Sequence, residues 1–328
     1  MKNMEECIMK KVIMLSTGGT IASKRNPKTG LLTAGLMTGE ELAEQCELPE
    51  TIEVDVQSVF QIPSNHMTFK ELVILKERIE ATFKDENVAG IVVTHGTDTL
   101  EETAYFLDLT IADDRPVVVT GSQRGPTVMG TDAFVNLRQA IMLAAYEEAR
   151  GLGTLVLFNE RIFSARYVEK VHASNVAGFT SYGFGYLGII DQDHIHIYQR
   201  PIKREYFALQ TELPEIEIVS CGLGSSGRFI RHAADVGLAG VIIEAPGRGH
   251  APPQIMESVH YALDKGLHLI LTTHAEEGEV KVVYDFPGSA YDLEKSGVVL
   301  GRDYSSKKAR IRLAVLLAAG QSDIAKFF

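Results

Sequence analysis

Short runs rich in Val and Ile alternate along this chain with longer segments whose apolar residues recur at helical spacing. The alternation predicts an α/β fold, a mostly parallel sheet flanked by helices, because a helix usually connects one parallel strand to the next. Such strands are typically buried on both faces. The expected strands are residues 12–15, 52–59, 88–93, 117–119 and 154–158, and the expected helices are residues 38–45, 68–83, 99–109 and 131–149.

A second, shorter α/β series follows a stretch without clear periodicity. We expect residues 196–212 to link a larger N-terminal domain, residues 1–195, to a smaller C-terminal α/β domain, residues 213–328. Two domains agree with the length of 328 residues, since a domain typically has about 150 residues. The expected strands of the second domain are residues 216–220, 241–244 and 268–272, and its helices lie near residues 228–235, 253–265 and 305–319.

Two threonines carry the signature of a helix N-terminus. Thr68 is followed three residues later by Glu71, and Thr99 is followed in the same way by Glu102. In a capping box the Thr hydroxyl accepts a bond from the first helical turn, while the Glu side chain accepts one from the Thr N–H. The spacing predicts a capping box at the start of both helices.

The net charge restricts the classes of binding partner, and the number of cysteines indicates the cellular compartment. The formal net charge of −11 argues against nucleic acid or an anionic membrane as a partner, since both are bound by basic patches. No apolar run approaches the ~18 residues of a membrane span, and the first one, residues 12–15, is too short for a secretory signal. Cys7, Cys46 and Cys221 are too few for a disulfide framework or a zinc site, so we expect idle or buried thiols and a cytoplasmic protein.

Hydroxyl side chains and glycines follow three of the expected strands, in the turns 16–23, 94–99 and 120–125. In an open parallel sheet, ligands bind outside the carboxyl ends of the strands. Three such turns at one edge predict a pocket for a small polar ligand and a hydroxyl nucleophile. Each turn taken alone also fits ordinary helix caps and tight turns.

A hydroxyl nucleophile needs a base, and the sequence has no Gly-x-Ser-x-Gly elbow and no histidine placed with acids as in a Ser–His–Asp set. Lys170 is a candidate base if burial lowers its pKa, although the composition of the segment around it fits a lysine on the surface. The pair His194 and His196 fits a solvated strand edge better than a metal site.

Two segments of this chain resemble the paired signatures of the bacterial-type L-asparaginases. These are Thr17-Gly18-Gly19-Thr20-Ile21-Ala22 and Thr94-His95-Gly96-Thr97-Asp98-Thr99-Leu100-Glu101-Glu102-Thr103-Ala104, which lie about 75 residues apart. Weaker likeness lies in 119–124, 132–137, 165–170 and Lys308-Ala309-Arg310, so that the resemblance spans the whole chain.

The resemblance implies an amidohydrolase that converts L-asparagine to L-aspartate and ammonia through an acyl-enzyme, without a metal or an organic cofactor. The family's nucleophile falls on Thr20, and its second catalytic group falls on Thr97, Asp98 and Lys170. Asp98 would also pair with the α-ammonium of the substrate. The remaining substrate-binding positions implied by the resemblance are Ser64, Asn65 and Ser122.

The likeness also has implications beyond one active site. Well-studied relatives carry a Tyr on a mobile lid, here residues 24–35, and the alignment places Leu32 at that position. The family resemblance further implies a homotetramer in which each site lies between the first domain of one subunit and the second domain of its partner. Arg248 and His250, in a polar loop after an expected strand, are the residues we expect near the partner's pocket.

Three alternatives remain open at the level of sequence. The chain could be a glutaminase-asparaginase of broader amide specificity, or a weakly active amino-acid-binding relative in which Leu32 impairs activation. The segment Gly222-Leu223-Gly224-Ser225-Ser226-Gly227 also fits the Gly-x-Gly-x-x-Gly pattern of dinucleotide binders, with Glu244 near the distance of a ribose-binding acid.

Overall fold

A computed structural model describes residues 9–25, 29, 32–33 and 37–328. The chain divides into two compact units, residues 1–206 and residues 207–328. The division falls inside the segment predicted as a linker, but that segment is not structureless throughout, because a strand covers His194–Ile197. Cys7 lies outside the described residues, while Cys46 and Cys221 are free and buried.

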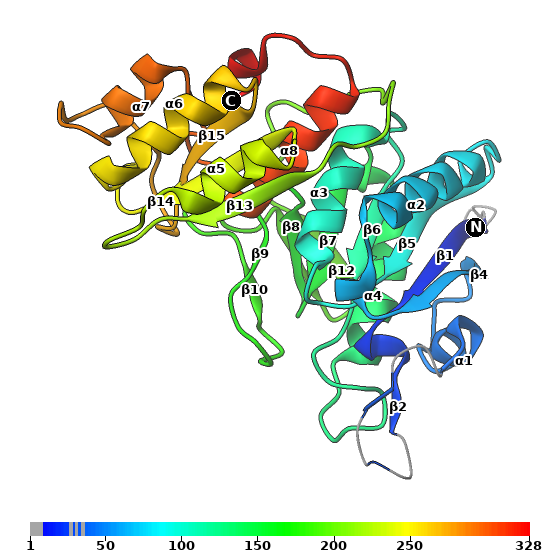
Figure 1. The fold of residues 1–328 in the computed structure, drawn as a ribbon. Helices are drawn as coiled ribbons and strands as arrows, with labels where there is room; N and C mark the ends of the chain where they lie inside the picture. The colour runs from blue at the N-terminus through cyan, green and yellow to red at the C-terminus, as the bar shows by residue number, and fades with distance from the viewer. Residues whose placement is uncertain (1–8, 26–28, 30–31, 34–36) are drawn as a thin grey trace. The chain divides into compact units, whose positions relative to one another are not determined.

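The first unit is built on an eight-stranded sheet (Figure 1) with the order β12-β11-β8-β7-β6-β5-β1-β4. Its strands are β1 (Lys10–Gly18), β4 (Ile52–Ile62), β5 (Val88–Thr94), β6 (Val117–Thr120), β7 (Thr154–Phe158), β8 (Arg161–Ser164), β11 (Gly188–Asp191) and β12 (His194–Ile197). The five strands from β4 to β7 in this order are parallel, and the other three are antiparallel. The predicted α/β class with a mostly parallel sheet is confirmed.

Helices cover both faces of this sheet. On one face α4 (Ala133–Ala144) packs on β5, β6 and β7, and α1 (Gly39–Glu44) packs on β4 and α4. On the other face α3 (Leu100–Thr110) packs on β6, β7 and α2 (Phe69–Thr82). Apolar strand residues such as Met14, Val92 and Val118 are fully buried against α4, which is why the central strands carry Val and Ile with no charge.

Two small antiparallel hairpins extend the first unit. One pairs β2 (Lys24–Arg25) with β3 (Leu32–Thr33), in the segment predicted as a lid. The other pairs β9 (Glu169–Lys170) with β10 (Phe179–Thr180). The second hairpin carries Lys170, and the sequence pattern gave no sign of it.

Three expectations for this unit are wrong in detail. β4 lies at the edge of the sheet with alternating exposure, so it is not buried on both faces. The helix predicted for 131–149 ends at Ala144, whose carbonyl packs tightly on Gly90, and a separate short turn covers Glu147–Ala149. The capping box at Thr68 is present, but the Thr99 side chain does not cap its helix, because its hydroxyl donates to the Ser64 carbonyl at 2.9 Å.

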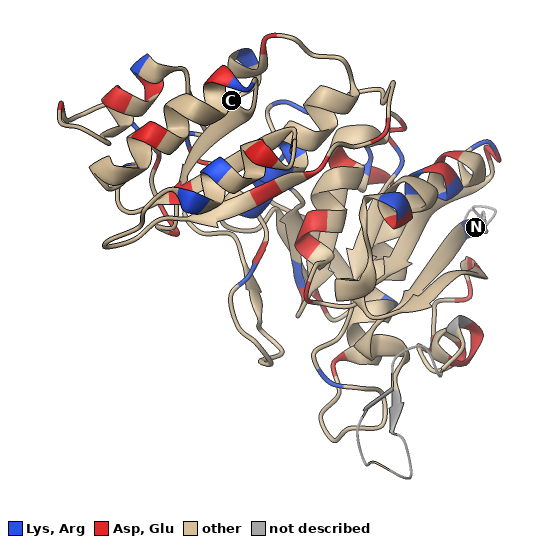
Figure 2. Cartoon of the chain, in the orientation of Figure 1, with Lys and Arg blue, Asp and Glu red and all other residues tan. Residues whose placement is uncertain are grey.

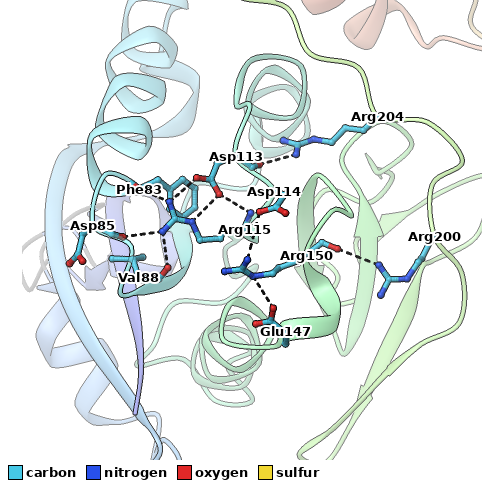
Figure 3. Close-up of polar contacts among 10 residues, drawn as sticks. All are labelled: Phe83, Asp85, Val88, Asp113, Asp114, Arg115, Glu147, Arg150, Arg200 and Arg204. Carbon is cyan, nitrogen blue, oxygen red and sulfur yellow. Dashed lines mark hydrogen bonds and ion pairs between the residues drawn. The ribbon is translucent and has the colours of Figure 1, made fainter. Parts of the chain in front are cut away.

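Charged side chains gather where β5 and β6 begin, at the edge of the sheet opposite to their carboxyl ends (Figure 3). Arg115 donates to the carbonyls of Asp85 and Val88, both at 3.0 Å, and forms an ion pair with Asp113 at 2.7 Å. These bonds tie the loop before β6 to the backbone where β5 begins, where the Asp85 carbonyl also accepts a bond from the Val88 N–H at 3.2 Å. The cluster therefore serves the structure of the strand starts.

The second unit holds a parallel sheet of four strands in the order β13-β14-β15-β16. Its elements are β13 (Ile216–Ser220), α5 (Arg228–Asp235), β14 (Gly240–Ala245), α6 (Met256–Asp264), β15 (His268–Thr273), α7 (Ala290–Ser296), β16 (Val299–Leu300) and α8 (Ser306–Ala318). The smaller α/β domain is confirmed as a fold, although α7 and β16 were not predicted.

Figure 2 shows acidic and basic residues interspersed along α2, α5 and α7. Mixed charge of this kind does not build the basic stripe that nucleic acid requires. Among the described residues, no helix is both long enough and apolar enough to cross a membrane.

Candidate active site

Turns that follow four neighbouring parallel strands meet backbone to backbone at the carboxyl edge of the large sheet. A Cβ atom on Gly18 would lie 2.6 Å from the Ile62 carbonyl oxygen, and one on Gly19 would lie 2.4 Å from the Gly96 nitrogen. A Cβ atom on Gly121 would lie 2.4 Å from the His95 carbonyl oxygen. The glycines of these turns are therefore required by the close approach, which brings β1, β4, β5 and β6 to a common site.

Three of the residues predicted as catalytic are in direct contact. The Lys170 Nζ donates to Thr97 Oγ1 at 2.8 Å and to Asp98 Oδ1 at 2.6 Å. The side chain of Lys170 is only 11% exposed, whereas that of Asp98 is 69% exposed. The lysine therefore reaches from the β9–β10 hairpin into the turn after β5, and the carboxylate keeps one face open to a ligand.

Thr20 begins a short 3-10 turn directly after β1 and is half-buried. Two hydroxyls fix this segment: Thr17 Oγ1 donates to the Thr94 carbonyl at 2.8 Å, and Ser23 Oγ donates to the Gly19 carbonyl at 2.9 Å. The first bond ties the end of β1 to the end of β5. Together with the packing of Gly19 on Gly96, it holds the turn of Thr20 against the turn of Thr97.

Ser64 and Asn65 follow β4 in a single 3-10 turn but differ in burial. Ser64 is buried, and a Cβ atom on Gly96 would lie 2.8 Å from its Oγ. The hydroxyl of Thr99 holds the Ser64 carbonyl in place. Asn65 is exposed. The structure thus brings Ser64 to the turn of Thr97 and leaves Asn65 on the rim.

Ser122 comes directly after β6 and is fully buried. Its Oγ has no hydrogen-bond partner among the described residues. Buried hydroxyls are usually paired, so an orphaned one at this edge is available to a polar ligand.

A polar network that sequence reasoning missed supports the turn after β6. Asp132 accepts bonds from the backbone N–H groups of Gln123 and Arg124 at 3.0 and 2.9 Å, and Asn136 donates to the Gly121 carbonyl at 2.9 Å. The Gln123 Oε1 in turn accepts a bond from the Thr97 hydroxyl at 3.3 Å. The pattern Asp-x-x-x-Asn at a helix start was the signal, because it places both side chains on one helical face.

Burial changes the titration of His95 and of the two described cysteines. His95 is fully buried, and the loss of solvation lowers its pKa to about 4. Burial raises the pKa of Cys46 and of Cys221 to about 11, so both thiols stay protonated and unreactive near neutral pH.

Two further predictions concern segments apart from this cluster. Leu32 lies in β3, opposite Arg25 of β2, and most of the loop around it lies outside the described residues. In the second unit, Arg248 is exposed, and His250 Nδ1 accepts a bond from the Ala290 N–H at 3.3 Å.

Of the three glycines in the dinucleotide pattern, only Gly227 is closely packed, since a Cβ atom there would lie 2.9 Å from Ser258 Oγ. Gly222 and Gly224 have open space where a Cβ would stand, and Leu223 is fully exposed. Glu244 accepts a bond from the Ser306 hydroxyl at 2.6 Å and is thus engaged inside its own unit. These features describe a surface turn between β13 and α5.

Comparisons with known proteins agree along the whole chain. Family models described as asparaginase, N-terminal, and glutaminase/asparaginase C-terminal domain match residues 11–203 and 215–328. An L-asparaginase of Bacillus licheniformis is 56% identical over 96% of this chain and 98% of its own. A glutaminase-asparaginase of Pseudomonas fluorescens biotype A is 32% identical over 94% of this chain and 87% of its own. A crystal structure of a probable cytoplasmic L-asparaginase from Campylobacter jejuni superimposes with a TM-score of 0.88 at 30% identity, covering 97% of this chain and 98% of that one.

Proposed function

Because the chain belongs to the asparaginase family and is therefore a hydrolase of amides, we propose that it converts L-asparagine to L-aspartate and ammonia with Thr20 as the nucleophile. The observation that carries this proposal is the contact of Lys170 with Thr97 and Asp98, in the turn that packs against the turn of Thr20. A lysine beside a buried hydroxyl and an open carboxylate supplies a proton-transfer group and an ammonium-binding group in one place.

In the first half-reaction, Thr20 Oγ1 attacks the carbon of the side-chain amide. The amide nitrogen takes up a proton and leaves as ammonia, and the acyl group remains as an ester on Thr20. Water then cleaves this ester, and the proton returns to Thr20 as L-aspartate is released.

The Thr97–Lys170 pair is the group that moves these protons. Its two heavy atoms are 2.8 Å apart, a distance across which a proton can pass. In its neutral form Lys170 accepts the proton of the Thr97 hydroxyl, which itself takes one from the attacking group. Before the transfer, the bonds of Lys170 to Asp98 and of Thr97 to Gln123 hold the two side chains in place, and the Thr97 hydroxyl hydrogen then turns from Gln123 to the neutral amine.

The backbone N–H of Thr97 suits the oxyanion of both tetrahedral adducts. It has no acceptor among the described residues, although Thr97 is only 6% exposed. A donor that is fixed before the reaction stabilises the charge that develops on the substrate oxygen.

The substrate is held by charge and by hydroxyls. Asp98 has acceptor capacity beyond its bond to Lys170 and would bind the α-ammonium group. Ser64 and Ser122 would bind the carboxylate end and the amide end respectively, and Asn65 would close the rim. No step in this scheme needs a metal or an organic cofactor, so activity should be unchanged by a chelator.

An ammonia-release assay on L-asparagine, D-asparagine, L-glutamine and a β-aspartyl amide tests the proposal. We expect L-asparagine to be the best substrate and Thr20→Ala to abolish release from all four. Release from L-glutamine at a comparable rate would favour the glutaminase-asparaginase alternative, which the Pseudomonas relative keeps open. Binding of L-aspartate without any ammonia release would identify a binding protein instead.

We propose in addition a cytoplasmic homotetramer in which residues 1–195 supply the site above and residues 213–328 complete the site of a neighbouring subunit. Exposed Val283, Tyr284 and Phe286 of the second unit offer apolar surface that a second copy would cover. The ring centroid of His250 lies 5.3 Å from that of Tyr284 and 5.2 Å from that of Phe286. Arg248 and His250 are therefore the residues we expect at the neighbouring site.

Subunit mixing tests the shared site. Thr20→Ala chains are dissociated and reassembled with chains altered at Arg248 and His250. Activity that reappears from two inactive parents supports shared sites, and a mixture that stays inactive contradicts them.

A further inference from the structure

The buried histidine of the turn after β5 has both ring nitrogens occupied. His95 Nδ1 lies 2.7 Å from the Gly96 carbonyl oxygen, and Nε2 lies 3.0 Å from Thr103 Oγ1 on α3. A carbonyl oxygen can only accept, so Nδ1 carries the hydrogen. In a neutral ring Nε2 is then an acceptor, and the Thr103 hydroxyl must donate to it.

This arrangement specifies one tautomer of a neutral imidazole. His95 has no solvent exposure, and Thr103 is 1% exposed. Burial disfavours the charged ring and lowers its pKa, so the neutral form persists at neutral pH. The backbone N–H of His95 also donates to the Thr120 carbonyl at 2.8 Å.

The bond from Nδ1 to the Gly96 carbonyl also fixes the direction of the Thr97 N–H, because both groups belong to one peptide unit. The described chain has no cis peptide bonds, so the Gly96 carbonyl and the Thr97 N–H point in opposite directions across one planar unit. A carbonyl turned toward His95 therefore turns the Thr97 N–H away from it. That N–H has no acceptor among the described residues, whereas buried N–H groups are nearly always paired.

We propose that His95 is a positioning residue: as the neutral Nδ1–H tautomer, held by Thr103, it fixes the Gly96–Thr97 peptide so that the Thr97 N–H stays directed at the substrate oxyanion. This inference rests on the proposed amide hydrolysis. His95 touches no reacting atom and moves no proton. It orients the Thr97 N–H, because without the bond from Nδ1 the Gly96–Thr97 peptide could rotate.

Thr103→Val tests the tautomer lock, because valine keeps the shape of threonine and removes the donor to Nε2. We expect kcat for L-asparagine to fall between about 10- and 100-fold with little change in KM, since a small misplacement of a reacting group costs up to ~10². Thr103→Ser restores the hydroxyl and should restore most of kcat. Thr110→Val is the matched control, because Thr110 is a buried residue of the same helix whose hydroxyl bonds only to the Phe106 carbonyl.

A second pair of variants tests which nitrogen matters. His95→Asn keeps a donor near the position of Nδ1, whereas His95→Gln places its amide near the position of Nε2. We expect His95→Asn to retain several-fold more of kcat than His95→Gln. The reverse order would overturn the assignment of Nδ1 as the donor.

Ligand binding separates positioning from general damage to the fold. An aldehyde analogue of L-asparagine forms a hemiacetal with a threonine hydroxyl, and its oxygen then occupies the oxyanion position. We expect Thr103→Val to weaken this analogue by the factor seen in kcat and to leave L-aspartate binding unchanged. If the wild-type protein is active, two results for Thr103→Val would overturn the proposal. One is that both ligands bind more weakly by the same factor, and the other is that kcat is unchanged. A wild-type protein that hydrolyses no amide would instead refute the proposed function itself.

Discussion

Two glycine-bearing turns in this chain each join a parallel strand to a helix, yet the space beside the glycines that follow the strand differs. The turn 94–99 after β5 is packed so tightly that a Cβ atom on Gly96 would lie 2.8 Å from Ser64. The turn 222–227 after β13 has open space beside Gly222 and Gly224. The Oγ of Ser225, one of its two serines, accepts a bond from the Gly222 N–H of the same turn at 2.9 Å.

This comparison shows how a functional site differs from a sequence motif alone. Glycines and hydroxyls after a strand permit a ligand to approach, but a site also needs polar groups from several turns buried together. At 94–99, Lys170 from the β9–β10 hairpin and Ser64 from the turn after β4 lie against the turn that holds the buried His95. At 222–227 the Ser225 Oγ bonds within its own turn, and the close approach of Gly227 to Ser258 and Ile255 packs the start of α5 against the start of α6. The predictions below compare the two turns, beginning with the largest expected effect.

Loss of the proton-transfer pair should have the largest effect. Thr97→Ala and Lys170→Met should each lower kcat by about 10²–10⁴-fold, the range for an acid–base group. The double variant should be little worse than either single one, because residues that act as a unit are not additive. Steady-state kinetics of ammonia release measures this, and Ser225→Ala in the open turn should leave kcat unchanged. Near-normal turnover of Lys170→Met would show that another group is the base.

The buried histidine should make stability depend on pH. Its pKa is lowered from 6.5 to about 4, so between these values the unfolded chain binds a proton that the folded chain does not. The free energy of unfolding should therefore fall as pH decreases through this window, by up to about 3 kcal/mol from this group.

His95→Asn is the control for that pH dependence. Burial also lowers the pKa of His250 and of His268, so these residues add a slope of the same sign to both proteins. Denaturant unfolding at several pH values should show a flatter profile for His95→Asn than for the wild type. Parallel profiles would contradict the buried, neutral state of His95.

Much of the fold could be predicted from the sequence, and the limits have physical causes. β7, β13 and α5 lie at the predicted residues because each is a strongly patterned run bounded by turn residues. The short strands β8 and β16 were missed, since two to four residues carry too little periodicity. Thr68 and Thr99 share one signature, but a tertiary contact with Ser64 takes the second hydroxyl away from its helix.

The candidate site was predictable only in part. The order of hydroxyl-bearing turns indicates which strand ends carry chemistry, and the resemblance selects Thr20, Thr97, Asp98 and Lys170. No local pattern shows that Lys170, 73 residues further along the chain than Thr97, contacts the turn of Thr97 from the β9–β10 hairpin. The part played by His95 is equally hidden, because it depends on a helix residue, Thr103, that faces it only in the folded chain.

A single methyl group should distinguish the packed turn from the open one. Gly96→Ala forces a Cβ into Ser64 and should lower the free energy of unfolding by about 1–3 kcal/mol, with a loss of activity, because overpacking displaces the neighbours. Gly222→Ala adds the same atom to open space and should stay within about 0.5 kcal/mol of the wild type. Thermal or denaturant unfolding measures both, and equal destabilisation would show that the turns do not differ in packing.

The smallest effect concerns the two threonines with the same signature. Thr68→Ala removes a true cap and should lower the free energy of unfolding by about 1 kcal/mol without changing KM. Thr99→Ala removes the hydroxyl that holds the Ser64 carbonyl, so we expect a similar or smaller loss of stability together with a KM for L-asparagine that rises a few-fold. Both substitutions remove one hydroxyl from a helix start. A change in KM for Thr99→Ala alone would therefore separate the effect on the site from the effect on stability. A KM that changes equally in both variants would show that Ser64 does not depend on Thr99 for its position in the site.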